Sequence, residues 1–188
     1  LRRAPRLLII SSGCHGIEGH VGSAGQTALL SDPAWRALTR EAGVAVLYLH
    51  ALNPHGFAWG RRATQENVDL NRNFLDFAQP LPQNAAYDEL AALLVPTHWP
   101  PNPAGEAVLD RLLSQRGWPE MQRAISCGQY GHPEGLFYGG RNPTWSHVTL
   151  RQVLREQGRS CAQLGWIDVH SGLGPWGVGE RIFEGRAG

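Results

Sequence analysis

The stretch LLIISSGCHGIEG, residues 7–19, decides the fold, because an apolar run ends there in a glycine-rich turn. Its first six residues are apolar and then small, and glycine closes the run, which predicts a buried strand over residues 7–12. The turn leads into a helix that we expect to reach about residue 30. A second helix begins at Asp32-Pro33, where aspartate can cap the helix and proline can take its first position.

A second apolar run, residues 44–50, follows that helix and predicts another buried strand. Buried strands that alternate with helices indicate parallel pairing, so the expected fold class is α/β. Residues 51–74 show no clear period, and a loop this long inside a compact domain is usually functional. Further along the chain we expect helices over residues 84–95, 104–116, 119–127 and 144–157, with Thr144 as the cap of the last, and a third strand over residues 165–170.

Length and composition restrict the classes of function. The 188 residues suit one domain with a sizeable core, and 42% hydrophobic residues indicate a globular chain. The net charge is +1 and the basic residues are scattered, so we expect no nucleic-acid partner. The apolar runs are far too short to span a bilayer, so we expect no membrane partner. Three cysteines, an odd count, disfavour a disulfide framework and favour reduced thiols in a cytoplasmic protein.

Two of the predicted strands lead into histidines, and together they supply the donors of a metal site. His15 and Glu18 lie three residues apart in the glycine-rich turn, where the backbone can fold tightly enough to aim both at one ion. His170 ends the third strand. Two imidazoles and one carboxylate, with one position left open, are typical ligands of a catalytic zinc ion, so we expect one Zn²⁺ per chain. His20 is an alternative ligand from the same turn.

Asp168 is the candidate for a supporting role at this site. It precedes His170 by two residues, so both side chains point to the same face of the strand. A carboxylate there can hold the outer nitrogen of a metal-binding histidine, which is the role we expect for Asp168. The alternative is a structural carboxylate that caps nearby backbone.

Arginine and asparagine side chains flank the expected metal site. Arg61 and Arg62 precede Asn71 and Arg72 by about ten residues. Arginine fits a carboxylate with two parallel hydrogen bonds, and one arginine could instead stabilise the charge that develops on a carbonyl oxygen. The pattern therefore predicts an anionic substrate. The alternatives are exposed arginines without a ligand, or an ion pair of Arg72 with a nearby aspartate.

The order of these motifs resembles the zinc metallocarboxypeptidases of the M14 class. The resemblance is closer to a bacterial branch of that class, the DUF2817 family, and it covers most of the chain. The aspartoacylase and succinylglutamate desuccinylase deacylases share part of the pattern. The motifs that carry the resemblance are Ser-Gly-x-His-Gly-x-Glu-Gly at residues 12–19, Asn-Pro-x-Gly-Phe-Ala-Trp at 53–59, Val-Asp-Leu-Asn-Arg-Asn-Phe at 68–74, Gly-Leu-Phe-Tyr-Gly-Gly at 135–140 and Asp-x-His-Ser-Gly-Leu-Gly-Pro at 168–175.

The resemblance implies roles for individual residues. The implied zinc ligands are His15, Glu18 and His170. Arg62 would face the scissile carbonyl, with Arg61 as the fallback, and Asn71 and Arg72 would hold the free carboxylate of a small-molecule or peptide substrate.

The implied fold is a mixed, mostly parallel sheet with helices on both faces, in one catalytic domain over residues 1–188. The implied activity is hydrolysis of an amide bond beside a carboxylate by a zinc metallohydrolase, and the alternative is an N-acyl amino acid deacylase.

The chain departs from the family pattern after its last ligand. The family's general base is a glutamate well beyond that position, and only eighteen residues follow His170 here. We therefore expect a chain truncated at its C-terminus, holding the N-terminal and central part of the domain, and a catalytically impaired metal-binding remnant is a further alternative. An open sheet edge would favour association into a homo-oligomer. The Gly-x-Gly-x-x-Gly pattern at residues 172–177 is a poor dinucleotide site, because Pro175-Trp176 stands where the helix should start.

Overall fold

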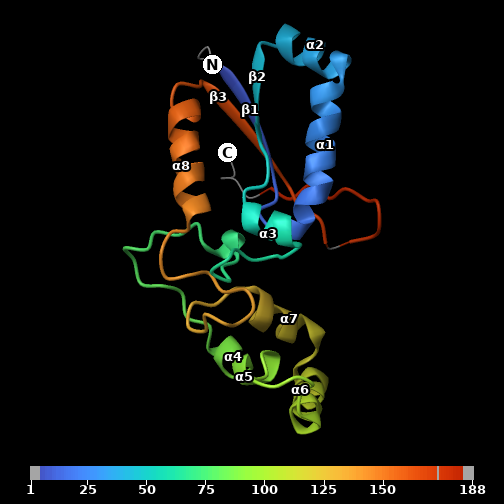
Figure 1. The fold of residues 1–188 in the computed structure, drawn as a ribbon, viewed down its shortest axis with the longest axis vertical. Helices are drawn as coiled ribbons and strands as arrows, with labels where there is room; N and C mark the ends of the chain where they lie inside the picture. Colours follow the sequence, from blue (N-terminus) through green and yellow to red (C-terminus); the bar gives the residue numbers. More distant parts are fainter. Residues whose placement is uncertain (1–4, 173, 184–188) are drawn as a thin grey trace.

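The structure, a computed structural model, describes residues 5–172 and 174–183 and contains a three-stranded sheet with helices around it (Figure 1). The strand order is β2-β1-β3, and both outer strands pair with β1 in parallel. The strands are β1 (Arg6–Ser12), β2 (Val44–Leu49) and β3 (Gln163–Val169). The predicted α/β class is confirmed, and every pairing in this sheet is parallel.

The central strand is also the most buried, as its apolar sequence requires. Ile9 of β1 has no exposed surface, which fits a strand that is covered on both faces. Helix α1 (Gly19–Ser31) packs against β1, and α2 (Pro33–Glu41) packs against β2. In Figure 1, α8 (Trp145–Gly158) lies on the opposite side of the sheet from α1. Helices therefore flank the sheet on two sides.

Two predicted helix starts are confirmed by their caps. The Asp32 carboxylate accepts a hydrogen bond from the Ala34 amide at 2.8 Å, and Pro33 takes the first position of α2. At the start of α8, the Thr144 hydroxyl accepts a hydrogen bond from the His147 amide at 3.2 Å. These caps satisfy amides that have no partner within the helix, and so they fix where each helix begins.

A helical cluster between residues 85 and 126 has its own apolar core. It consists of α4 (Ala85–Asp88), α5 (Ala91–Leu94), α6 (Pro103–Arg116) and α7 (Trp118–Ser126). The prediction of one helix over residues 84–95 is wrong, because a turn at Glu89-Leu90 separates α4 from α5. Leu90 is fully buried at this turn and packs with Met121 and Ala124. Tertiary packing here outweighs the local preference for a longer helix.

The stretch of residues 51–74, predicted as irregular, contains α3 (Pro54–Trp59) and the 3-10 helix η2 (Leu70–Arg72). The Asn53 side chain caps α3 by accepting a hydrogen bond from a first-turn amide at 2.8 Å, and Gly60 ends the helix with a φ of +61°. Six residues are too few to display a helical period, which is why the sequence pattern does not reveal α3.

The parallel strands end at one edge of the sheet, and the predicted site follows from this. The 3-10 helix η1 (Gly16–Glu18) comes after β1, and His170 comes directly after β3. Open α/β sheets place ligands at this edge. On its outer side β3 pairs with no strand among the described residues. Trp166 and Ile167 of this strand, whose side chains point to opposite faces of the sheet, are both exposed.

None of the helices in residues 5–172 and 174–183 has both the length and the apolar character needed to cross a membrane.

Candidate metal centre

The turn after β1 packs directly against the backbone that carries the arginines. A side chain at Gly16 would collide with the backbone of Gly56 in α3, so only glycine allows this approach. The Ile17 amide donates a hydrogen bond to the Arg61 carbonyl at 3.1 Å. This contact places Arg62, the next residue, beside the predicted metal-binding turn.

The three predicted ligands come together at the carboxyl edge of the sheet. His15 Nδ1 lies 2.9 Å from one Glu18 carboxylate oxygen, and His170 Nδ1 lies 3.4 Å from the other. The two imidazole rings meet edge to face with their centroids 5.0 Å apart. One ligand atom from each of the three residues falls within 4.8 Å of the other two. We call His15, Glu18 and His170 the metal trio.

A carboxylate stands behind each histidine of the metal trio. His15 Nε2 lies 3.1 Å from Asp69 Oδ1, and His170 Nε2 lies 2.7 Å from Asp168 Oδ2. The Ser11 hydroxyl, paired with Asp168 across the β1–β3 register, donates to its other oxygen at 2.6 Å. A proton on each Nε2 leaves both Nδ1 lone pairs facing Glu18, which is the arrangement found around protein-bound zinc.

The two supporting carboxylates differ in how far the sequence reveals them. Asp168 lies where the two-residue spacing on β3 places it. Sequence reasoning did not assign Asp69 to the site, because His15 lies 54 positions away in the chain. The available signal was its place in the same motif as Asn71 and Arg72. The Asp69 carboxylate is held by a second contact, because its Oδ1 also accepts a hydrogen bond from the Asn71 amide at 2.9 Å.

The donor set of the metal trio fits zinc. Two imidazole nitrogens and one carboxylate are the protein ligands of many catalytic zinc sites, and they leave a fourth position for water or substrate. His15 is 4% exposed, so its donor atom is held in place before any ion arrives. The residues present therefore suit Zn²⁺ in both donor chemistry and arrangement.

Two other candidate ligands are less suitable. Cys14 Sγ forms a second group with Asp168 and His170, but burial, followed by the charges of Asp168 and Asp69, raises the pKa of the thiol. A neutral thiol is a poor metal ligand. His20, the alternative ligand from the turn, packs against Phe57 with ring centroids 4.5 Å apart and the rings tilted by 39°, and it belongs to neither group.

Arg62 is the arginine that the fold brings to the metal trio. Its Nε donates to Asp69 Oδ2 at 3.0 Å, and its Nη1 lies 3.4 Å from Glu18 Oε1. Its Nη2 lies 2.8 Å from His15 Nε2. The guanidinium can donate to this nitrogen only when the nitrogen carries no proton, whereas a protonated Nε2 donates to Asp69. The Arg61 side chain is exposed, and Arg61 contacts η1 through its backbone carbonyl.

The charges of the cluster shift the pKa values of its members in opposite directions. The Asp168 carboxylate, followed by Glu18, raises the pKa of His170 to about 9. Burial favours the neutral form of Glu18, but hydrogen bonds from His15 and His170 outweigh it and hold its pKa below the usual range. Burial likewise opposes charge on His15, yet hydrogen bonds to Asp69 and Glu18 raise its pKa overall. Protons on the imidazoles thus compete with a metal ion for the same site.

The two residues predicted to hold a substrate carboxylate are placed differently from the metal trio. The Asn71 side chain is exposed next to Asp69. The Arg72 guanidinium instead donates to the Ser126 carbonyl at the end of α7, from Nη2 at 2.8 Å and from Nε at 3.3 Å. The alternative of an Arg72–Asp69 ion pair is not what forms, because Asp69 pairs with Arg62.

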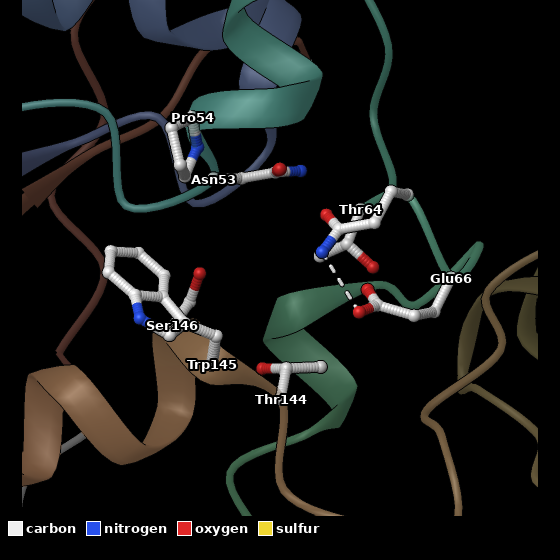
Figure 2. A pocket seen from close by; sticks show the side chains of 8 residues that line it. Asn53, Pro54, Thr64, Glu66, Thr144, Trp145 and Ser146 are labelled. Carbon is white, nitrogen blue, oxygen red and sulfur yellow. Dashed lines mark hydrogen bonds between the residues drawn. The ribbon is translucent and has the colours of Figure 1, made fainter.

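A pocket lies between the start of α3, residues 64–66 and the start of α8. Figure 2 shows Asn53 and Pro54, at the start of α3, facing Thr64 and Glu66 across this pocket, with Thr144, Trp145 and Ser146 at the start of α8 closing it. The side chain of Asn53, which lines this pocket, donates to the Arg62 carbonyl at 3.1 Å. No member of the metal trio lines the pocket.

After Gly174, residues 174–183 form no helix, so the Gly-x-Gly-x-x-Gly pattern lacks the helix start that a dinucleotide phosphate requires. Leu173, within that pattern, lies outside the described residues.

Comparison with known proteins returned one family. No curated protein and no solved structure matches the chain. One protein family, described as "Protein of unknown function (DUF2817)", matches residues 1–188. The match spans the turn after β1, the Asp69–Asn71 segment and the end of β3, and thus every residue of the site described above. The chain therefore belongs to the DUF2817 family.

Proposed function

We propose that this protein is a zinc-dependent hydrolase that cleaves an amide bond adjacent to a carboxylate, in the manner of the M14 metallocarboxypeptidases. The observation that carries the proposal is the metal trio: two histidines from different strand ends share one glutamate, and each has a carboxylate behind it. An ordinary surface cluster has no need of both outer carboxylates, whereas a metal site uses them to fix the orientation of its ligands.

The residues of the chain divide the work as follows. His15, Glu18 and His170 would hold the ion, which when bound supplies a Lewis acid for the scissile carbonyl and for an attacking water. Arg62 contributes a guanidinium at the edge of the site, 39% exposed in its side chain, where it can donate to a carbonyl oxygen that gains negative charge. Removal of one such donor costs on the order of 100-fold in rate.

Asn71 and Arg72 are our candidates for holding the substrate carboxylate. Asn71 offers an exposed amide close to the supporting Asp69. Arg72 would exchange its hydrogen bonds to the Ser126 carbonyl for a carboxylate, which is a better partner because it is charged. The substrate class is therefore a peptide with a free C-terminus or an N-acyl amino acid.

One observation favours a second candidate, a protein that binds metal without turnover. Among the described residues, the carboxylates of the site are Glu18, Asp69 and Asp168, and each one contacts a histidine of the metal trio. A carboxylate engaged in this way is poorly placed to accept a proton from water. The second candidate is therefore a site that binds zinc and an anionic ligand without hydrolysing it.

A substrate panel on the zinc-loaded protein tests these functions against one another. The panel contains peptides with free and amidated C-termini and a series of N-acyl amino acids, with release of amino acid as the readout. Hydrolysis of free but not amidated peptides supports the peptidase, and hydrolysis confined to N-acyl amino acids supports the deacylase. Zinc binding without hydrolysis supports the second candidate. A folded protein that takes up no zinc would contradict all three.

Arg62→Lys and Arg61→Ala form a matched pair within the same test. We expect Arg62→Lys to keep zinc and to lose about 100-fold in kcat, because a lysine cannot reproduce the planar donor group. Arg61→Ala should leave both zinc and kcat unchanged, since the Arg61 side chain is exposed. Equal losses in the two variants would remove Arg62 from the site.

A further inference from the structure

The aromatic ring of Phe137 covers one face of the Arg62 guanidinium. Arg62 Cζ lies 4.8 Å from the centroid of the ring, within the range of a cation–π contact. Phe137 belongs to the glycine-rich loop between α7 and α8, more than seventy residues along the chain from Arg62. We propose that Phe137 is a positioning residue that holds Arg62 against the metal trio, a proposal that rests on the hydrolase function proposed above.

Phe137 adopts a backbone conformation that an aromatic residue rarely takes. Its φ is +52°, in the left-handed region, where a side chain with a Cβ is strained. Such a conformation costs on the order of 1 kcal/mol or more and persists only where the surroundings enforce it. A glycine at position 137 would adopt this φ without strain, so the presence of phenylalanine there indicates that its side chain matters.

Buried groups enforce this conformation from both sides. The Phe137 carbonyl accepts a hydrogen bond from the Gln129 amide at 3.2 Å, and the Gln129 side chain donates to the Leu136 carbonyl at 3.2 Å. The Leu136 amide donates to the Tyr87 hydroxyl at 2.7 Å. Gln129, in the same loop, is 1% exposed, and Tyr87 of α4 is fully buried, so both of these partners lie in the packed interior. The strained residue is thus held between two fixed points.

Asp69 couples this loop to the arginine itself. Its amide donates to the Tyr138 carbonyl at 2.7 Å, while its carboxylate accepts from Arg62 Nε at 3.0 Å. One buried residue therefore fixes both the backbone next to Phe137 and one edge of the guanidinium. With the ring on its face and Asp69 on its edge, Arg62 has lost the freedom to swing away from His15.

Loss of the Phe137 ring should affect the position of Arg62 and should leave the metal ligands in place. Phe137 is partly exposed and contacts the guanidinium from outside the metal trio. A guanidinium that is free to rotate would spend part of its time away from the position where a carbonyl oxygen gains charge. Loss of the ring should therefore lower kcat, because pre-positioning matters most in the transition state, and it should spare both zinc binding and KM.

Substitutions at position 137 on the zinc-loaded protein test this role. We expect Phe137→Leu, which keeps apolar volume without a π face, to lower kcat about tenfold, equal to about 1.4 kcal/mol. Zinc content and KM of Phe137→Leu should stay within about twofold of the unchanged protein. A separate variant, Phe137→Trp, should keep the kcat of the unchanged protein, because indole is the strongest cation–π partner. In an Arg62→Lys background, Phe137→Leu should have little further effect. A fall in zinc content, a change confined to KM, or full activity in Phe137→Leu would overturn the proposal.

A measurement independent of turnover separates failure of this proposal from failure of the proposed function. In the ¹H–¹⁵N spectrum of the arginine side chains, the Arg62 Nε–H signal is identified by its loss in Arg62→Lys. Phe137→Leu should shift this signal, because the ring current is gone, whereas Leu136→Ala, a change at an exposed neighbour 46% accessible to solvent, should not. If no substrate is hydrolysed but the shift occurs, the positioning stands without the hydrolase. An unshifted Arg62 signal in Phe137→Leu contradicts the positioning itself.

Discussion

The ends of β1 and β3 each supply one histidine to the metal trio, yet they do so in different surroundings. His15, after β1, is 4% exposed and lies between Asp69, Glu18 and Arg62. His170, after β3, is one-third exposed in its side chain and follows a strand whose residues are mostly open to solvent. The β1 half of the site is thus fixed by burial, while the β3 half depends on partly exposed contacts of His170 with Asp168 and Glu18. If the metal trio binds zinc as we propose, the ion would complete the half of the site that burial does not fix.

Removal of each histidine in turn is the strongest test of the difference between the two halves of the site. We expect His15→Ala and His170→Ala both to lose zinc, but to differ in the stability of the metal-free protein. His15→Ala should lower the free energy of unfolding by about 2–3 kcal/mol, because it leaves buried polar groups without a partner. His170→Ala should cost less than about 1 kcal/mol, since its ion pairs are partly exposed. Urea unfolding in the presence of a chelator measures both values, and equal losses would contradict the difference between the two halves.

The two supporting carboxylates, Asp69 behind His15 and Asp168 behind His170, should also differ in how much they contribute to metal affinity. Loss of a carboxylate behind a metal-binding histidine typically weakens the affinity by 10-fold to 100-fold. We expect Asp69→Asn near the upper end, because Asp69 also holds Arg62 and the Asn71 amide, and Asp168→Asn near the lower end. Competition with a fluorescent zinc chelator measures the affinity. Asp110→Asn, an exposed change on α6, is the control and should have no effect.

The larger part of the pH dependence should come from the β3 half, and His15 adds to it in the same direction, because its pKa is also raised. Asp168 and Glu18 raise the pKa of His170 to about 9 from its ordinary 6.5. A raised histidine pKa means that the charged form stabilises the metal-free fold fully below pH 6.5, and that this stability is lost as the pH rises towards 9. Zinc affinity should rise over the same interval, because the departing proton frees the ligand. In the metal-free protein, the free energy of unfolding should fall as the pH rises across this interval, and it should fall less steeply in His170→Ala, where only His15 still contributes. An unchanged slope in His170→Ala would assign the effect to another group.

Of these substitutions, Arg72→Ala should have the smallest effect on zinc binding, because Arg72 contacts neither half of the site. Its guanidinium donates to the Ser126 carbonyl, so we expect a loss of about 1 kcal/mol in stability and no loss of zinc. If Arg72 also holds the substrate carboxylate, KM should rise while zinc content stays constant. Zinc content and KM measured on the same preparation check both statements. Loss of zinc in this variant would show that Arg72 acts within the metal trio.

Much of the fold could be predicted from local pattern. The apolar run before Gly13 predicts β1, and the Asp32-Pro33 pair predicts the start of α2, because both signals act over a few residues. The failures lie where distant contacts decide. Leu90 breaks a predicted helix because its side chain packs against Met121, some thirty residues further along the chain. Short α3 has a cap, Asn53, but too few residues for a period.

The site divides in the same way. His15 and Glu18 are neighbours in one turn, and Asp168 and His170 are neighbours at one strand end, so spacing alone pairs them. The partnership of Asp69 with His15 and the cover of Arg62 by Phe137 join residues far apart in the chain. No short sequence pattern reveals either contact, because each depends on how separate loops meet in the folded chain.

The zinc content of the protein after exhaustive buffer exchange, measured by mass spectrometry beside His15→Ala and His170→Ala, tests the central claim most directly. The metal trio predicts close to one zinc ion per chain in the unchanged protein and close to none in either variant, with all three proteins folded by circular dichroism. A folded, unchanged protein that binds no added zinc, or a His170→Ala variant that retains a full equivalent, would contradict the metal centre described here.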